Sequence, residues 1–489
     1  MAMTSLLGLG AVRRLPAESR PLVRPGTVPA GIVHLGLGAF FRAHQAVYTE
    51  AALAAAGGDW GIVGVAPRSR SVVEALATQD QLYSVTSLSA GDARTRVVGA
   101  LAASHAAVAD PARIVALLAD PAIRVVTLTI TEKGYRLDPA TGRLLSDPSL
   151  DSDLLGDQPP TTVPGLLVRG LLARARADAG PIAIVSCDNL PSNGRRVRGM
   201  LDAAFARAGR PDGWVRANVT CPGTMVDRIV PASTEATRSA AHAALGVVDQ
   251  VALSAEPYMQ WVIEDDFPGG RPAWEAAGAV LTDEAGPWER LKLRALNGVH
   301  SGIAYLGALA GRETIVDALE MPGMADAMRR FVAEDVAPSF TPPAGVSVVA
   351  YGASALDRFA NPAIAHRTTQ VAMDGSQKLP QRVLETIGDR RSAGATPRWG
   401  ALVVAAWMRY ARGVADDGRA LDLDDPLAPS IRAAIAAAPT TPEGLADALF
   451  GLTAVFPPPL ASDEVVRGLV VEWLTEFEKH GVESTLAGL

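Results

Sequence analysis

The chain has 489 residues, which is enough for two or three domains with cores of their own. Its formal net charge is −7 and its basic residues form no run, which argues against nucleic acid or an anionic membrane and favours a small-molecule partner. Cys187 and Cys221 lie in no metal-binding spacing, and no apolar run is long enough for a membrane span. We therefore expect a cytoplasmic protein without a structural metal.

The first half of the chain alternates predicted strands and helices. Residues 1–27, with three prolines and four arginines, are expected to be an irregular N-terminal extension. Apolar runs predict strands at 31–36, 60–65, 124–129 and 181–186, and alanine-rich stretches predict helices at 43–56, 106–118 and 166–177. This alternation predicts an α/β fold with a parallel sheet covered on both faces. The dinucleotide-binding type of this fold, the Rossmann type, is expected over 28–285.

After Pro287 the sequence becomes helical almost to its end. The Gly286-Pro287 turn marks the predicted boundary, and a mainly α-helical C-terminal domain is expected over 286–489. The predicted helices span 288–309, 323–334, 379–386, 399–412, 429–437 and 462–480. We expect the active site in the cleft between the two domains.

A glycine turn follows the first predicted strand and opens a helix. Gly36 and Gly38 suit a dinucleotide pyrophosphate, because glycine lets the backbone come close and helix amides face the anion. Phe41 stands where a third glycine is usual, and Phe41 and Arg42 are expected near the cofactor. The alternative is a tight strand-to-helix turn that binds no ligand.

The second predicted strand bears on the choice of cofactor. NAD sites usually carry an acidic residue after this strand, but here Arg68-Ser-Arg-Ser follows it. Arg68 suits the 2′-phosphate of NADP, whereas a solvent-facing loop charge is the plainer interpretation. We expect NAD and leave NADP open.

Polar residues follow two further predicted strands. Asn189 comes after the strand at 181–186, and Thr131 and Glu132 come after the strand at 124–129. Ligands bind at the carboxyl ends of strands in open α/β sheets, so we expect Asn189 to donate to a substrate oxygen and the other two to lie at the cofactor. Ordinary turn chemistry is the alternative.

One predicted helix carries a lysine, a carboxylate, an amide and an imidazole. At about 100° per residue, Glu289 lies near 60°, His300 near 80° and Asn297 near 140° from Lys292, so one flank can present all four. A desolvated lysine exchanges a proton with a substrate hydroxyl more readily, and Asn297 can donate to the oxygen. The alternative is a solvated helix face with an incidental lysine.

These segments together resemble the polyol-specific long-chain dehydrogenase family over nearly the whole chain. The resemblance is carried by His34-Leu-Gly-Leu-Gly-Ala-Phe-Phe-Arg42-Ala-His44, Thr129-Ile-Thr-Glu-Lys-Gly-Tyr135, Ser186-Cys-Asp-Asn189, Met225-Val-Asp-Arg-Ile229, Lys292 to His300, Arg358-Phe-Ala-Asn-Pro362 and Asp374-Gly-Ser-Gln-Lys378-Leu-Pro380. It implies a metal-independent hydride transfer between a substrate carbon and a nicotinamide. Members are often monomeric, and a monomer is expected here.

The resemblance also implies roles for single residues. Lys292 is similar to the family's general acid/base, and Asn189 and Asn297 to its paired amide donors. Glu289 is similar to the carboxylate that relays protons to water. The residues similar to the family's substrate-hydroxyl contacts are Asp227, His300 and Lys378.

Extra positive charge distinguishes a branch within the family. Lys133 within Thr131 to Tyr135, and Arg367 after His366, resemble fructuronate reductase. Lys133, Arg367 and Arg382 are candidate partners of a substrate carboxylate, with surface or structural charge as the alternative. The expected reaction interconverts D-fructuronate and D-mannonate. The alternatives are a polyol dehydrogenase of the mannitol 2-dehydrogenase kind, a non-catalytic sensor and a methyltransferase binding S-adenosylmethionine at the glycine turn.

Overall fold

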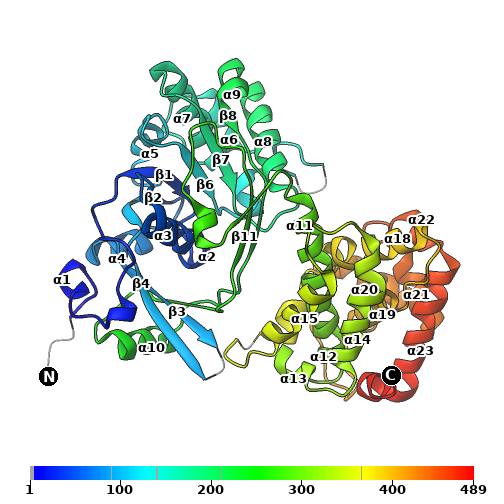
Figure 1. Cartoon of the computed structure of the whole chain (residues 1–489). Coiled ribbons are helices and arrows are strands. Elements are labelled where there is room, and N and C mark those ends of the chain that lie inside the picture. The colour runs from blue at the N-terminus through cyan, green and yellow to red at the C-terminus, as the bar shows by residue number, and fades with distance from the viewer. Residues whose placement is uncertain (1–4, 90, 139–140, 211, 365) are drawn as a thin grey trace. The chain divides into compact units, whose positions relative to one another are not determined.

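The computed structural model describes residues 5–489 except 90, 139–140, 211 and 365. The chain forms two compact units, Met1–Gly286 (unit 1) and Pro287–Leu489 (unit 2). Unit 1 combines strands and helices, and the described part of unit 2 is built from helices joined by loops (Figure 1).

A six-stranded parallel sheet forms the centre of unit 1. Its strands lie in the order β5-β2-β1-β6-β7-β8, so the chain starts in the middle and builds outward in both directions. That is the strand order of a doubly wound dinucleotide-binding sheet, which confirms the predicted α/β fold. The strands are β1 (Ala30–Leu35), β2 (Gly61–Ala66), β5 (Leu101–Ala106), β6 (Val125–Leu128), β7 (Ile182–Ser186) and β8 (Val219–Thr220).

Helices cover both faces of this sheet, because alternate residues of each strand point to opposite sides. Val33 and Leu35 pack into a cluster with α5, α7 and α8, whereas Ile32 packs into a cluster with α2 and α3. The helices of unit 1 are α1 (Leu9–Val12), α2 (Ala39–Ala43), α3 (Gln45–Ala56), α4 (Ser71–Thr78), α5 (Pro111–Leu118), α6 (Pro148–Leu155), α7 (Val163–Ala177), α8 (Asn193–Arg207), α9 (Gly213–Asn218) and α10 (Glu235–Leu245).

Two predicted helices of unit 1 have different bounds in the structure. The one expected over 43–56 begins earlier and is broken at His44, whose Nε2 lies 2.9 Å from the Gln260 carbonyl oxygen. The one expected from residue 106 begins only at Pro111, because β5 occupies 101–106 and pairs with β2. Asp110 caps this helix by accepting a hydrogen bond from Arg113 N.

Two small three-stranded sheets complete unit 1. One has the order β10-β3-β4, and the other the order β12-β11-β9. Their strands are β3 (Tyr83–Ser89), β4 (Asp92–Val98), β9 (Thr224–Asp227), β10 (Leu253–Ala255), β11 (Gln260–Glu264) and β12 (Val280–Thr282). The N-terminal segment belongs to this unit too, since Leu7, Ala11 and Leu15 pack with Leu82 and Leu245.

Unit 2 is organised around two buried helices, α12 (Val299–Leu309) and α19 (Arg398–Ala411). Most side chains of both lie in one continuous hydrophobic core. The other helices are α11 (Gly286–Leu291), α13 (Ile315–Leu319), α14 (Met324–Arg330), α15 (Val348–Phe359), α16 (Thr368–Ala372), α17 (Gly375–Leu379), α18 (Glu385–Ser392), α20 (Ala428–Ala437), α21 (Pro442–Phe450), α22 (Pro458–Ala461) and α23 (Glu464–Ala487).

Three helices of unit 2 change to π-helical winding, in which each N–H bonds to the carbonyl five residues back. The π-helical segments are Lys292–Gly298, Phe331–Val336 and Pro380–Leu384. The helix predicted over 288–309 therefore consists of α11, a π-helical segment and α12. Among the described residues, no helix joins the length and the apolarity needed to cross a bilayer.

Candidate active site

The turn after β1 has a backbone that only glycine can adopt. Gly36 has φ 116°, and a Cβ there would lie 2.0 Å from the Thr129 carbonyl oxygen. Thr129 Oγ1 donates to the Gly36 carbonyl oxygen at 2.8 Å, which ties the end of β1 to the residue after β6. The predicted glycine turn therefore lies at the carboxyl edge of the sheet, between its two central strands.

Gly38 leaves the outer side of this turn open. The residue is exposed, and a Cβ built on it would come no closer than 3.8 Å to a neighbouring atom. A phosphate can thus approach the backbone here without meeting a side chain. The turn fits the pyrophosphate of a dinucleotide.

The side chains of Phe41 and Arg42, which were expected near the cofactor, make contacts within unit 1. The Phe41 ring is buried and stacks on His34 with centroids 3.5 Å apart. Arg42 Nη1 donates to the Val251 carbonyl oxygen at 2.8 Å, and its guanidinium lies over the Tyr83 ring. The Phe41 ring and part of the Arg42 guanidinium are thus used within the fold.

His34 supports the same turn from inside. Its Nε2 lies 2.9 Å from both the Gly36 carbonyl oxygen and Thr129 Oγ1. Burial lowers the pKa of His34 to about 3, so the ring is neutral at physiological pH. A neutral imidazole sets the turn without adding charge.

The loop after β2 is exposed and contains Arg68 and Arg70 but no acidic residue between Ala66 and Ser71. The Ser69 and Ser71 hydroxyl oxygens lie 3.0 Å apart within it. Nothing in this loop would repel a 2′-phosphate.

Asp188 joins the carboxyl ends of β6 and β7. Its Oδ1 accepts from Thr131 N at 2.9 Å, while its Oδ2 accepts from Ile130 N at 3.1 Å and from the Tyr135 hydroxyl at 2.7 Å. Thr131 has φ 63°, which is strained for a β-branched residue. Asp188 therefore holds the strained backbone of the loop that was predicted to contact the cofactor.

The neighbouring predicted residues of that loop are on the surface. Glu132 is half-buried and forms a long ion pair with Arg196 at 3.8 Å, and Lys133 is exposed. Exposed charges of this kind contribute little to stability.

Asn189 follows Asp188 at the end of β7 and is exposed. Its loop is fixed by Asn193, whose amide donates to the carbonyl oxygens of Asp188 and Thr224 and whose Oδ1 accepts from Thr224 N. Asp227 ends β9 and is buried. Sequence reasoning missed the role of Asn193, although an asparagine at the start of a helix is a known signal for such bonds.

Lys292 and Asn297 lie in unit 2 within the π-helical segment Lys292–Gly298, and they are 7% and 8% exposed. The wider π turn rotates Asn297 back toward Lys292, because residues five apart are then about one turn apart. The estimate of about 140° between them assumed α-helical winding and is wrong for this segment. Glu289 lies one turn earlier, in α11, and is half-buried.

His300 lies in the first turn of α12, near several positively charged side chains. Its ring stacks on Phe359 with centroids 4.3 Å apart and lies 5.7 Å from the His366 ring. Burial lowers its pKa well below the usual value, and the nearby cations lower it further. Its Nε2 is buried and has no hydrogen-bond partner among the described residues. The cations are Arg382, Lys378 and Arg358, and His366, whose own pKa is lowered by burial, acts in the same direction when it is protonated.

Lys378 lies in α17, and its polar contacts within the described part of the chain are long. Its Nζ lies 3.4 Å from the Val371 carbonyl oxygen and 3.9 Å from the Asp374 carboxylate. Burial lowers its pKa, and so does the charge of Arg382. The ammonium thus keeps hydrogen-bonding capacity for a ligand.

Arg382 contacts the active-site helix directly. Its Nη1 donates to Ser301 Oγ at 3.0 Å and to the Asn297 carbonyl oxygen at 3.5 Å. Because these contacts use the guanidinium itself, Arg382 is tied to the helix that also carries Lys292.

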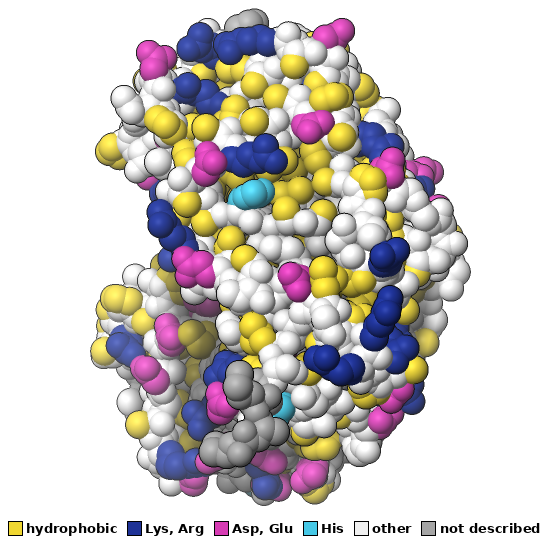
Figure 2. Space-filling model, turned by 90° about the vertical axis from the view of Figure 1, so that its left-hand side faces the viewer, with side chains coloured by type: hydrophobic (Ala, Val, Ile, Leu, Met, Phe, Trp, Pro, Cys, Tyr) yellow, Lys and Arg dark blue, Asp and Glu magenta, His cyan; other side chains and the backbone are white. Residues whose placement is uncertain are grey.

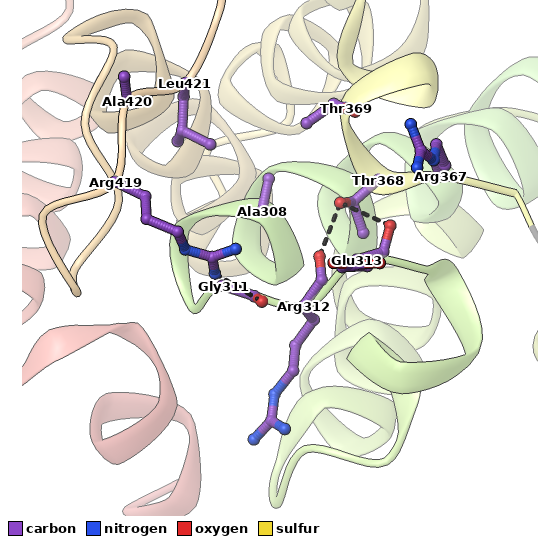
Figure 3. A pocket seen from close by; sticks show the side chains of 10 residues that line it. All are labelled: Ala308, Gly311, Arg312, Glu313, Arg367, Thr368, Thr369, Arg419, Ala420 and Leu421. Carbon is purple, nitrogen blue, oxygen red and sulfur yellow. Dashed lines mark hydrogen bonds between the residues drawn. The ribbon is translucent and has the colours of Figure 1, made fainter.

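Arg367 lies elsewhere, in a surface cavity of about 210 Å³ beyond the C-terminal end of α12 (Figure 3). The residue is exposed. The cavity also contains Arg312 and Arg419, and neither Lys292 nor His300 is among its ten lining residues. Arg367 is thus not brought into the group around His300.

Charge on the surface agrees with a small-molecule partner. Lys and Arg side chains alternate with Asp and Glu over the face drawn in Figure 2, with no field of one sign. Within the described ranges, no group of histidine, cysteine and acidic side chains has the arrangement of a metal site.

Comparison with known proteins agrees with this architecture. Family models for the mannitol dehydrogenase Rossmann domain and the mannitol dehydrogenase C-terminal domain match residues 30–276 and 284–473. The chain belongs to the mannitol dehydrogenase family, whose members are oxidoreductases acting on sugar alcohols or sugar acids.

Three similar proteins illustrate the range of this family. The chain is 42% identical to the Escherichia coli uncharacterized oxidoreductase YeiQ, over 92% of this chain and 93% of that one. It is 38% identical to the Escherichia coli D-mannonate oxidoreductase, over 96% and 98%. The structure of Pseudomonas fluorescens mannitol 2-dehydrogenase with NAD and D-mannitol matches with a TM-score of 0.84 and 34% identity, over 99% of both chains.

Proposed function

We propose that this protein interconverts a ketouronate and its aldonate, with D-fructuronate and D-mannonate as first choice. NAD is the proposed hydride carrier and NADP the alternative, since the loop carrying Arg68 has no acidic residue. The similarity to D-mannonate oxidoreductase over almost the whole chain supports the sugar-acid class. The structure of Pseudomonas fluorescens mannitol 2-dehydrogenase with NAD supports NAD as the hydride carrier.

The observation that carries the choice of substrate is the set of cations around His300. Lys378, Arg358 and Arg382 all lower the pKa of that ring. A neutral polyol gains little from such charges, whereas a carboxylate forms charge-assisted hydrogen bonds with them. We assign the carboxylate to Lys378, because both of its polar contacts are long. Lys133 and Arg367 are exposed and less suited to this role.

Lys292 is the proposed general acid/base. A bound nicotinamide supplies the hydride in the reduction and accepts it in the oxidation. In the reduction, the Lys292 ammonium gives its proton to the substrate oxygen, and the Asn297 amide donates a hydrogen bond as that oxygen gains negative charge. Glu289, one turn away, returns a proton from water to the lysine. The ketone thus gains one hydride and one proton, and the proposed reaction needs no metal.

Two residues of unit 1 also have proposed roles toward the substrate. Asn189 is the second amide donor to the reacting oxygen, and Asp227 accepts from a substrate hydroxyl. Both stand at the ends of strands, and Asn193 fixes the loop of the first. If Asn189 and Asn297 act on one oxygen, the losses of kcat in the two single variants will not add in the double variant.

A substrate panel tests the proposal. Initial rates are measured with fructuronate, tagaturonate and fructose plus NADH or NADPH, and with mannonate and mannitol plus the oxidised cofactors. We expect kcat/KM for fructuronate to exceed that for fructose by about 100-fold, because a buried cation left without its carboxylate is costly. A preference for fructose would contradict the ketouronate assignment.

A second candidate is the oxidation of a neutral polyol. It is favoured by the match to mannitol 2-dehydrogenase, whose structure holds D-mannitol. A kcat/KM for mannitol above that for mannonate would support this candidate, because no substrate carboxylate is then involved.

A further inference from the structure

The active-site helix leaves α-helical winding over the seven residues Lys292–Gly298. Such segments are rare in proteins and are found mostly at functional sites. The α-helices on both sides, α11 and α12, do not by themselves favour the wider turn. Contacts from outside the helix are therefore needed to hold it.

Gly298 is where the three π-helical segments meet. A Cβ on this residue would lie 2.8 Å from the Arg382 carbonyl oxygen and 3.2 Å from Cε1 of Phe331. Arg382 belongs to the segment Pro380–Leu384, and Phe331 begins the segment Phe331–Val336. The close approach of the Arg382 backbone and the Phe331 ring to this point depends on the absence of a side chain at Gly298.

Arg382 then crosses the junction between the π-helical segment and α12. Its Nη1 reaches the Asn297 carbonyl oxygen, which is in the segment, and Ser301 Oγ, which is in α12. Ser301 is buried. The Arg382 guanidinium thus contacts both the last turn of the π-helical segment, at Asn297, and the first turn of α12, at Ser301.

Arg294 ties the same segment to α18. This arginine is 3% exposed and donates to Asp389 Oδ2 at 2.6 Å and to Ser339 Oγ at 2.9 Å. Its Nη2 also lies 3.3 Å from Glu385, the first residue after Pro380–Leu384. Arg382 therefore links the two π-helical segments, and Arg294 ties the first of them to α18, which follows the second.

We propose that Arg382 is a positioning residue, which holds the π-helical turn that brings the Asn297 amide to the face of Lys292. The inference rests on the proposed roles of Lys292 and Asn297. It predicts an effect on turnover of every substrate, acidic or neutral. A carboxylate contact at Arg382 would instead affect acidic substrates alone.

The test compares Arg382→Met, Arg382→Lys and Ser301→Ala with the matched control Arg391→Met. Arg391 is on α18 and donates to Asp463 and to the Ala395 carbonyl oxygen, so its loss removes similar bonds away from the π-helical segment. Measured are kcat with mannonate and with mannitol, KM for NAD, and amide hydrogen exchange over 293–302.

Arg382→Met should lower kcat about 100-fold with both substrates, because a displacement of about 1 Å at a reacting group costs that much. We expect KM for NAD to change less than about twofold, and exchange over 293–302 to become faster. Arg382→Lys should recover about tenfold of kcat, since an ammonium can still donate to one of the two acceptors. Arg391→Met should match the wild type.

A loss of kcat confined to mannonate would overturn the proposal, and so would equal kcat in Arg382→Met and Arg391→Met. If Arg382→Met does not fold, Ser301→Ala decides: a kcat loss of about 3- to 10-fold with both substrates supports the proposal, and an unchanged kcat contradicts it. If the wild type turns over no substrate of the panel, the proposed function fails. Hydrogen exchange then still decides the role of Arg382, because unchanged protection over 293–302 would refute it.

Discussion

The two units fix their functional groups by different means. In unit 1, polar residues stand where parallel strands end, and side chains such as Asp188 and Asn193 bond the loop backbones into place. In unit 2, Lys292 and Asn297 lie inside a helix whose winding has changed. A strand end is a local property of the sequence, whereas the winding of this helix depends on residues about 90 positions away, such as Arg382. The first kind of site can be found by pattern, and the second requires the packed structure.

The largest effect is expected at Lys292. Lys292→Ala should lower kcat about 1,000- to 10,000-fold, because general acid/base catalysis by a positioned group contributes on that scale. The measurement is NADH oxidation with fructuronate, with thermal unfolding to verify the fold. Lys479→Ala serves as the control, since Lys479 is exposed in α23 and pairs with the neighbouring Glu476. Near-normal turnover in a folded Lys292→Ala variant would contradict the proposed mechanism, because unit 2 would then lack the general acid/base assigned to it.

A smaller effect of a different kind is expected in unit 1. Asp188→Asn places an amide N–H opposite donors that now bond to the carboxylate, namely the Thr131 and Ile130 amides and the Tyr135 hydroxyl. KM for NADH should rise about 10- to 100-fold while kcat at saturating cofactor changes much less, since one unsatisfied buried donor costs about 1–3 kcal/mol. Asp178→Asn, on an exposed helix end, is the control. A fall in kcat with unchanged KM for NADH would contradict the assignment of Asp188 to cofactor binding.

Much of unit 1 could be predicted because its central strands are short apolar runs. The expected strands at 31–36 and 181–186 agree with β1 and β7 to within a residue at each end. The strands of the small sheets were not predicted. Half of β4 is exposed and polar, and β3 pairs with β10 from far along the chain, so neither shows a local apolar pattern.

The candidate site could be predicted less completely than the fold. The spacing of the glycine turn indicated Phe41 and Arg42, but their side chains point inward because stacking on His34 and a bond to Val251 use them. The helical wheel assumed one winding throughout, so it placed Asn297 too far from Lys292. The roles of Asn193 and Arg382 depend on backbone atoms that come close only in the folded chain.

The smallest predicted effect is on stability and compares one buried carboxyl from each unit. Burial raises the pKa of Glu50 in unit 1 to about 7 and that of Asp335 in unit 2 to about 6. A raised pKa favours the folded state below the unfolded pKa, and this stability is lost as pH rises through the folded pKa. Unit 1 should thus lose stability between about pH 4.5 and 7, and unit 2 between about pH 3.8 and 6.

Glu50→Gln keeps an acceptor for Gly99 N, which now bonds Oε1 at 2.6 Å, but removes the titration. The Tm difference between this variant and the wild type should change by a few degrees from pH 6 to pH 7.5, on the order of 1–3 kcal/mol. The Tm difference between Asp335→Asn and the wild type should change mainly below pH 6. Above that pH the Asp335 carboxyl of the wild type is already mostly ionised. Equal profiles for the two variants would show that the carboxyls do not titrate separately in the two units, and would remove this contrast between them.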